Sequence, residues 1–180
     1  MINSIFLDYD FYIFLDADYS NHSISGLENN KKECVDIHNI YSDTGKMPET
    51  YTHENTTIQQ LWWSKDDIDF EELENKTGIK VKTVSSICQQ PGIFITMHKD
   101  IFYAIKSKED TTNKHLVRAN IYLENWKPGH IFQYEKNNNW TDSINWKAGE
   151  GFIFDEDHIH LSANAGLSNK YTLQISGYLN

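Results

Sequence analysis

The feature that most restricts the fold of this chain is a series of short segments, rich in β-branched and aromatic residues, in its C-terminal half. Turn-forming sequences such as QQPG, WKPGH, WKAGEG and NAG separate them. The segments are residues 79–87, 92–105, 115–124, 130–136, 150–156 and 170–179. Six short strands in about 100 residues predict an antiparallel, mainly β unit, and a double-sheet jelly roll or a barrel is its natural closed form.

The N-terminal part of the chain has a different pattern. Residues 1–50 mix short apolar runs with Asn, Asp and Ser. The stretch 56–78, TTIQQLWWSKDDIDFEELENKTG, places acidic and apolar residues at helical intervals and stops at Gly78, which predicts one or two helices with a glycine C-cap. We therefore expect a single domain in which a mixed, helical N-terminal support (1–78) packs on a jelly-roll core (79–180).

Charge and composition restrict the possible partners. The formal net charge of −10 argues against nucleic acid, which needs a basic face, and against an anionic membrane surface. No apolar run approaches the roughly 20 residues of a membrane helix, and the N-terminus lacks the basic head of a signal peptide. The two cysteines, Cys34 and Cys88, have no tight spacing, so a reduced, cytoplasmic setting is expected. A small molecule or a peptide remains compatible as partner.

The sequence TMHKDIF contains a candidate metal-binding pair, His98 and Asp100. Residues i and i+2 of a strand share a face, so the imidazole and the carboxylate can converge. A chain of this composition contains about one such pair by chance, so a surface pair is the alternative. His158 and His160 lie about 60 residues later and offer a third ligand. Two histidines and one carboxylate bind Fe(II) and leave positions open for O₂ and a bidentate co-substrate.

Two cations in the β segments could bind an anionic co-substrate. Lys170 opens the segment KYTLQISGYL and shares its face with Thr172, a pairing that suits the distal carboxylate of a dicarboxylic acid. Arg118 is the only arginine of the chain and lies midway along LVRANIYLE. The alternatives are a solvated strand end for the lysine, a cross-strand pair for the threonine and a surface position for the arginine.

The order of these motifs resembles the Fe(II)/2-oxoglutarate-dependent oxygenase superfamily, in particular phage and marine-bacterial members related to aspartyl/asparaginyl β-hydroxylases. The resemblance covers about residues 88–178 and rests on PGIFITMHKD, LVRANIYLENWKPGHIF, NWKAGEGFIFDEDHIHLSANAG and KYTLQISG. Residues 1–87 carry no such match. The resemblance implies a double-stranded β-helix, that is, a cupin-like jelly roll.

The resemblance also implies a ligand set. Fe(II) would be held by His98, Asp100 and His160, since the distal histidine of the family precedes an asparagine, here Asn164, by a short gap. His158 would then face substrate, support the ligands or lie in the loop. A hydrogen bond to the second ring nitrogen would fix the tautomer of the metal histidine, and three residues are candidates to make it: Asp155, Glu156 and Asn164.

The implied reaction is hydroxylation of an unactivated C–H bond, of an amino acid or a peptide side chain, with 2-oxoglutarate and O₂ as co-substrates. The distal carboxylate of 2-oxoglutarate would pair with Lys170 and Thr172, or with Arg118. The family generally has arginine where this chain has Lys170, so the choice stays open. Trp126 and His130 are candidates to face substrate.

The alternation of side chains along a strand also concerns two aromatic residues. Phe94 and Phe102 are each separated from His98 and Asp100 by an even number of positions, so all four would line the same face of a regular strand.

Two other functions fit the same fold, because function does not follow from fold. The first is a cupin-like module that binds a sugar or a small metabolite without redox chemistry. The second is a metal cupin enzyme that does not use 2-oxoglutarate. Neither would produce succinate, which separates both from the oxygenase.

Overall fold

The computed structural model describes residues 2–25 and 50–179, so Cys34 lies outside the described residues. The strands are β1 (Ile2–Phe6), β2 (Ser23–Ser25), β3 (Thr57–Trp63), β4 (Ile79–Gln89), β5 (Phe94–His98), β6 (His115–Tyr122), β7 (His130–Lys136), β8 (Asn139–Ser143), β9 (Glu150–Asp155), β10 (His160–Asn164) and β11 (Lys170–Leu179). The helices are α1 (Tyr12–Leu15), α4 (His53–Thr56), α5 (Phe70–Thr77) and α6 (Tyr103–Lys106). None of these helices is long and apolar enough to cross a membrane.

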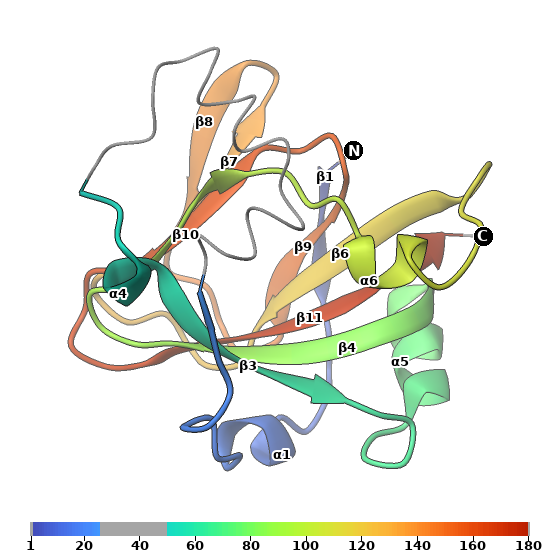
Figure 1. Cartoon of the computed structure of the whole chain (residues 1–180), viewed down its shortest axis with the longest axis horizontal. Helices are drawn as coiled ribbons and strands as arrows, with labels where there is room; N and C mark the ends of the chain where they lie inside the picture. The colour runs from blue at the N-terminus through green and yellow to red at the C-terminus, as the bar shows by residue number, and fades with distance from the viewer. Residues whose placement is uncertain (1, 26–49, 180) are drawn as a thin grey trace.

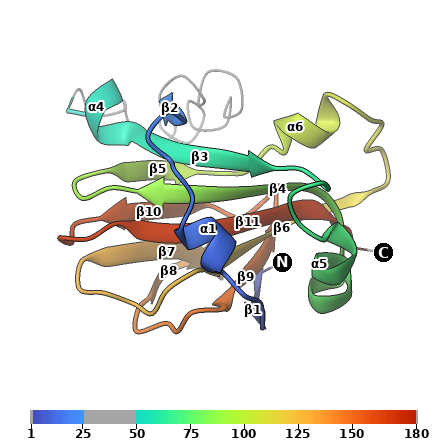
Figure 2. The ribbon, with the colours of Figure 1, turned by 90° about the horizontal axis from the view of Figure 1, so that it is seen from below.

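The strands form two antiparallel sheets that face each other (Figures 1 and 2). The larger sheet has seven strands in the order β1-β9-β6-β11-β4-β3-β2, and the smaller has four in the order β5-β10-β7-β8. Neighbours in each sheet are mostly distant in sequence, as when β11 pairs with both β4 and β6. This is the expected mainly β, double-stranded β-helix architecture, with α1 and α5 on one side of the larger sheet.

The outer face of the larger sheet carries the main apolar core. Phe14 from α1 and Leu73 from α5 pack there against Ile121 of β6 and Leu173 and Ile175 of β11, and all five side chains are fully buried. Figure 1 shows both helices on this side of the sheet. Because successive strand residues point to opposite faces, the residues between these positions must point toward the smaller sheet.

The inner face is more polar and more aromatic. Along β11, Lys170, Thr172, Gln174 and Ser176 alternate with the core residues and point inward, as does Tyr122 of β6. Aromatic rings fill part of this space between the sheets: Tyr122, Phe132, Tyr134, Trp146 and Phe154. They border the polar groups described below, since the ring centroids of Phe154 and His160 lie 4.5 Å apart.

The prediction of helix across 56–78 is wrong for its first half, because residues 57–63 form β3. The sequence TIQQLWW alternates inward and outward residues, and the inward Ile58 and Gln60 are buried against β4. Its β-branched and aromatic residues suit a strand in the interior of a sheet. The larger sheet therefore includes three strands that precede residue 79, namely β1, β2 and β3.

The second half of that stretch is the predicted helix, α5. The Asp69 carboxylate caps its N-terminus by accepting hydrogen bonds from the backbone N–H groups of Glu71 and Glu72. Gly78 ends it in the left-handed conformation, with φ of 70°. The glycine C-cap read from the sequence is therefore confirmed.

The six predicted β segments all contain strands, and those over 130–136 and 170–179 match β7 and β11 residue for residue. The segment 92–105 differs, because only residues 94–98 are strand and the chain then bends into α6. Two further strands in the C-terminal half, β8 and β10, were not identified from the sequence.

Candidate metal centre

Three side chains with metal-binding groups meet between the sheets. His98, Asp100 and His160 each offer one ligand atom, and these atoms lie within 4.8 Å of one another. His98 ends β5 and His160 begins β10, and the two are paired directly across the antiparallel ladder, with ring centroids 4.2 Å apart. The pairing of two strands that are 60 residues apart in the chain therefore brings the imidazoles together.

Asp100 reaches the cluster by a different route from the one expected. Strand β5 ends at His98, so the carboxylate comes from the bend after the strand and not from i, i+2 alternation. The bend continues into Phe102, whose φ of 53° is left-handed. Strand parity therefore does not extend to Phe102, which packs against Ile105 and Leu116 and does not line one strand face with Phe94.

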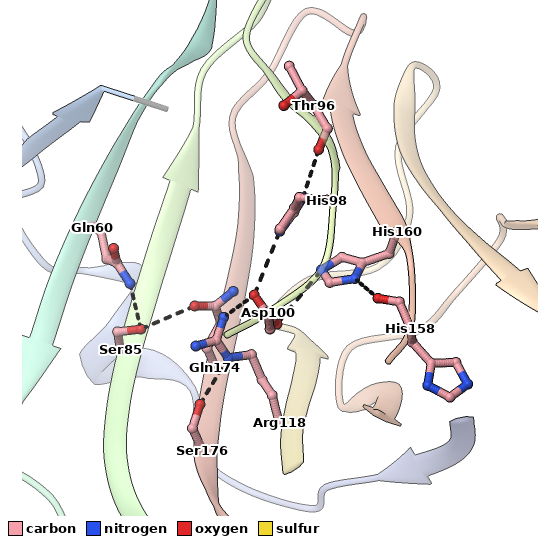
Figure 3. A network of polar contacts seen from close by, with 10 residues as sticks. All are labelled: Gln60, Ser85, Thr96, His98, Asp100, Arg118, His158, His160, Gln174 and Ser176. Carbon is pink, nitrogen blue, oxygen red and sulfur yellow. Dashed lines mark hydrogen bonds and ion pairs between the residues drawn. The ribbon is translucent and has the colours of Figure 1, made fainter. Parts of the chain in front are cut away.

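Main-chain carbonyls orient both imidazoles. Nδ1 of His98 lies 2.7 Å from the Thr96 carbonyl oxygen, and Nδ1 of His160 lies 3.1 Å from that of His158 (Figure 3). A carbonyl oxygen only accepts, so each Nδ1 carries the proton and each Nε2 turns a lone pair toward Asp100. The expected partners of the His160 ring, Asp155, Glu156 and Asn164, do not make this bond.

The three converging atoms are all acceptors. Nε2 of His98 lies 3.7 Å from Oδ1 of Asp100, and Nε2 of His160 lies 3.8 Å from Oδ2. Oδ2 is buried and has no hydrogen-bond partner among the described residues. Two atoms that each lie about 2.1 Å from one ion are at most about 4.2 Å apart, so the 3.8 Å between Nε2 of His160 and Oδ2 of Asp100 fits a shared ion. His98 faces Oδ1, the oxygen that Arg118 also engages.

The protonation states agree with a cation site. Burial would raise the pKa of the Asp100 carboxyl, but the Arg118 guanidinium holds that pKa below its usual range, so the group is ionised. Burial lowers the pKa of His160 to about 3, so this imidazole is neutral. Lone pairs that converge without a proton between them repel one another, and a bound cation removes that repulsion. Two imidazole nitrogens and one carboxylate are among the donor sets that bind Fe(II).

Arg118 lies beside the Asp100 carboxylate. Its Nη1 donates to Oδ1 of Asp100 at 2.8 Å, and its Nε donates to Oγ of Ser176 at 2.9 Å. The guanidinium also lies 5.4 Å from the centre of the Phe102 ring. Arg118 therefore holds Asp100 with one oxygen engaged and the other turned to the cluster.

Lys170 is a buried cation without an acidic partner among residues 2–25 and 50–179. Its Nζ donates to Oγ of Ser162 at 2.6 Å and to the Ile131 carbonyl oxygen at 2.5 Å, and it lies 5.7 Å from the centre of the Trp146 ring. Burial lowers its pKa to about 7. Thr172, two residues further along the inward face, is also buried. An anion beside Lys170 would restore its charge.

No known family model matches the chain, and no curated protein matches it in sequence. Two solved structures of similar fold are prolyl hydroxylases. One is the viral collagen prolyl hydroxylase of Paramecium bursaria Chlorella virus-1 with 2-oxoglutarate, at 16% identity and a TM-score of 0.50, covering 90% of this chain and 98% of that one. The other is a Trichoplax adhaerens prolyl hydroxylase with a hypoxia-inducible factor peptide fragment, at 11% identity and a TM-score of 0.50, covering 87% and 82%.

This chain shares their fold. At such low identity the likeness concerns the fold alone, and it supports the jelly roll expected from the sequence. The aspartyl/asparaginyl β-hydroxylase type suggested by the motifs is not among these two structures, so it stays a prediction.

His158 lies outside the cluster. Its Nδ1 is 2.6 Å from Oδ1 of Asp155, and its ring points away from His160 in Figure 3. That contact contributes to a lowered pKa of Asp155, of about 2. Of the two histidines in DEDHIHL, only His160 turns its ring toward Asp100.

The other residues considered from the sequence hold two turns together. Asn164 donates from Nδ2 to the carbonyl oxygens of Gln89 and Ser168, both at 2.8 Å. Trp126 donates from Nε1 to the His130 carbonyl oxygen at 2.9 Å, and Nε2 of His130 lies 3.1 Å from the Ser168 carbonyl oxygen.

These turns lie away from the cluster. On β10, Asn164 pairs with His130 and lies four residues from His160, which is about 13 Å along a strand. A structural role accounts for the contacts of Trp126, His130 and Asn164.

A pocket opens beside the cluster, and the sequence reasoning did not find most of its lining. Its volume is about 80 Å³, and His98, Asp100 and Arg118 form part of its wall. Gln60 and Gln174 line it from β3 and β11. Gln174 could have been found, because it shares strand parity with Lys170 and Thr172, whereas Gln60 was hidden by the helical reading of β3.

Proposed function

We propose that this protein is an Fe(II)- and 2-oxoglutarate-dependent dioxygenase that hydroxylates an unactivated C–H bond. The observation that carries the proposal is the cluster of two Nε2 lone pairs and one unpaired carboxylate oxygen between the sheets. The buried Lys170 contacts Ser162 on β10, the strand that begins at His160. In the reaction, R–H, 2-oxoglutarate and O₂ give R–OH, succinate and CO₂. One atom of O₂ enters the alcohol and the other enters succinate.

The proposal assigns the metal to His98, Asp100 and His160. Iron bound there would supply coordination sites for O₂ and the co-substrate and the redox chemistry of the reaction. The chain supplies fixed tautomers through the Thr96 and His158 carbonyl oxygens. It also supplies a carboxylate whose Oδ1 is held by Arg118, so that Oδ2 is left to bind the ion.

The proposal assigns the distal carboxylate of 2-oxoglutarate to Lys170 and Thr172. Lys170 contacts Ser162, which lies two residues from His160 on β10, and two strand residues span about 6.6 Å. A five-carbon dicarboxylic acid has about this reach from the metal. Arg118, the alternative, is already paired with Asp100, whereas an anion beside Lys170 would offset the cost of burying a cation.

The substrate proposed from the motifs is an amino acid or a peptide side chain. The pocket beside the cluster supports this size range, because a volume of about 80 Å³ suits a side chain and is well below that of a cavity for a drug-sized ligand. The finer assignment to the aspartyl/asparaginyl β-hydroxylase type rests on the sequence motifs.

An anaerobic titration of the full chain with Fe(II) and 2-oxoglutarate tests the function. Binding of both should produce the weak visible metal-to-ligand charge-transfer band, and admission of air with substrate should yield succinate. His160→Ala should abolish the band, and His158→Ala is the matched control that should keep it.

Each alternative has its own result in this titration. Iron binding without the band or succinate would favour a metal cupin enzyme that does not use 2-oxoglutarate. No metal binding at all would favour a non-redox binding module. Loss of the band in His158→Ala but not in His160→Ala would overturn the ligand assignment.

A further inference from the structure

Three side chains on adjacent strands form a polar chain along one wall of the pocket. Gln60 of β3 donates from Nε2 to Oγ of Ser85 on β4 at 2.8 Å. Ser85 donates from Oγ to Oε1 of Gln174 on β11 at 3.5 Å. Ser85 and Gln174 are directly opposite in the β4–β11 ladder, and Figure 3 shows Gln174 between Ser85 and Asp100. The sheet register therefore fixes this chain beside the metal cluster.

The two ends of this chain have opposite hydrogen-bonding character. The Ser85 hydroxyl accepts from one amide and has a single proton to donate to the other. The free ends are then one acceptor, Oε1 of Gln60, and one donor, Nε2 of Gln174. If both amides were turned over, the ends would still be one donor and one acceptor. Neither end has another hydrogen-bond partner among the residues that the structure describes.

The rest of the pocket lining has no net charge and is partly apolar. Among the described lining residues, the charged groups are Asp100 and Arg118, and they are paired with each other. Apolar side chains from three strands complete the walls: Ile58, Ile87 and Ile95. Trp62 and Tyr103 also line the pocket and are 50% and 51% exposed, so two aromatic rings stand at the solvent side.

We propose that this pocket binds an uncharged amide group of the substrate, with the amide oxygen facing the donor end and the amide N–H facing the acceptor end of the Gln60–Ser85–Gln174 chain. The proposal rests on the proposed function and makes the two glutamines specificity-determining residues. An amide offers one donor and one acceptor, which satisfies both ends at once. A carboxylate offers acceptors only, so it would leave the Gln60 oxygen facing negative charge, and sites built this way reject the mismatched group.

The amide has two possible sources in a peptide, the main chain and a carboxamide side chain. Three matched probes separate them: the N-acetyl, N′-methylamide derivatives of asparagine, alanine and aspartate. Ligand-observed NMR would measure their dissociation constants for the full, metal-free chain. Tighter binding of the asparagine probe than of the alanine probe assigns the site to a carboxamide side chain, and equal binding assigns it to the main-chain amide. The aspartate probe should bind about tenfold more weakly than the asparagine probe in the first case.

Variants of the glutamines test the recognition itself. Gln60→Met and Gln174→Met keep the side-chain length and should each weaken binding of the preferred probe about tenfold. Gln59→Met is the matched control, because Gln59 precedes Gln60 on β3 and points to the opposite face, and it should leave binding unchanged. If a methionine variant does not fold, Gln60→Glu and Gln174→Glu keep the size and should show the same loss. Unchanged affinity in the folded variants would overturn the proposal. So would an aspartate probe that binds as tightly as the asparagine probe when both bind more tightly than the alanine probe.

The titration with Fe(II) and 2-oxoglutarate distinguishes this proposal from the proposed function. The glutamine variants should keep the charge-transfer band and the 2-oxoglutarate affinity of the unmodified chain. A variant that loses the band together with probe binding reports damage to the metal centre and overturns the specificity role. If the unmodified chain shows no band but binds the amide probes through the two glutamines, the amide site stands and the oxygenase function fails.

Discussion

Arg118 donates a 2.8 Å hydrogen bond from Nη1 to Oδ1 of Asp100, and Oδ2 of the same carboxylate remains buried without a hydrogen bond. The pairing lets the only arginine of the chain orient the Asp100 carboxylate and keep it ionised. An arginine can hold one oxygen in a directed hydrogen bond while leaving the other free, which a more mobile ammonium does less well.

We predict that Arg118→Met weakens metal binding about 10- to 100-fold, the usual effect of removing a group that orients a metal ligand. Without the guanidinium, burial raises the pKa of Asp100, so the loss should be largest at low pH. Competition titration with Co(II) and a coloured chelator would measure both effects. The Co(II) affinity of Arg118→Lys, which keeps the charge, should lie between that of the parent chain and that of Arg118→Met. Equal Co(II) affinity in all three proteins would contradict the orienting role.

We predict that Lys170→Met raises the dissociation constant of 2-oxoglutarate about 100-fold, because one partner of a buried charge pair is removed. Thr172→Val removes a hydroxyl only and should cost about tenfold. Both should leave Co(II) affinity unchanged, which separates co-substrate binding from metal binding. Calorimetric titration of the Co(II)-loaded chain measures these constants. A larger loss in Arg118→Met than in Lys170→Met would assign the distal carboxylate to the arginine.

The stability of the ligand-free chain should also depend on Lys170. Its pKa is about 7 in the folded state and about 10.4 in an unfolded chain. Between these values the unfolded state binds more protons, so the contribution of Lys170 to the free energy of unfolding rises from about pH 7 to about pH 10. Below pH 7 the buried cation is fully destabilising.

Lys170→Met should therefore be more stable than the parent chain at pH 6, and the difference should shrink by pH 9. Urea unfolding at several pH values would measure it, with the exposed Lys80→Met as the control. A difference between Lys170→Met and the parent that does not change with pH would contradict the lowered pKa.

We predict that Gly129→Ala strongly destabilises the turns that hold Trp126 and His130. Gly129 has a φ of 90°, and an added Cβ would lie 2.3 Å from the backbone nitrogen of Gly166. Gly92 has a similar φ of 83° with nothing within 4 Å of an added Cβ, so Gly92→Ala measures the backbone strain alone. That strain is about 1–2 kcal/mol, and Gly129→Ala should cost clearly more in thermal unfolding. Equal losses of stability in the two variants would show that the chain around Gly166 can move away from an added Cβ at residue 129 without cost.

The amino-acid sequence by itself determined the local features of this protein. Alternating β-branched and aromatic residues with turn sequences between them identified the later strands, and Gly78 marked the end of a helix, because both depend on neighbouring residues. The motif of His98 and Asp100, with a histidine 60 residues later, predicted a metal site, but the strand alternation behind that prediction does not hold, because β5 ends at His98. The prediction of helix for residues 57–63 was wrong because this segment of mixed polarity, with Gln60 buried, is stabilised as a strand by pairing with β4.

Only the tertiary structure decided how the site is assembled. The register of β5 against β10 pairs His98 with His160 and leaves His158 outside, and a bend, not a strand, carries Asp100 to them. The pairing of Arg118 with Asp100, and of Gln60 and Gln174 through Ser85, joins segments far apart in the chain. Such contacts follow from which strands lie side by side, and strand pairing in a jelly roll is set by burial over the whole sheet, which no local pattern contains.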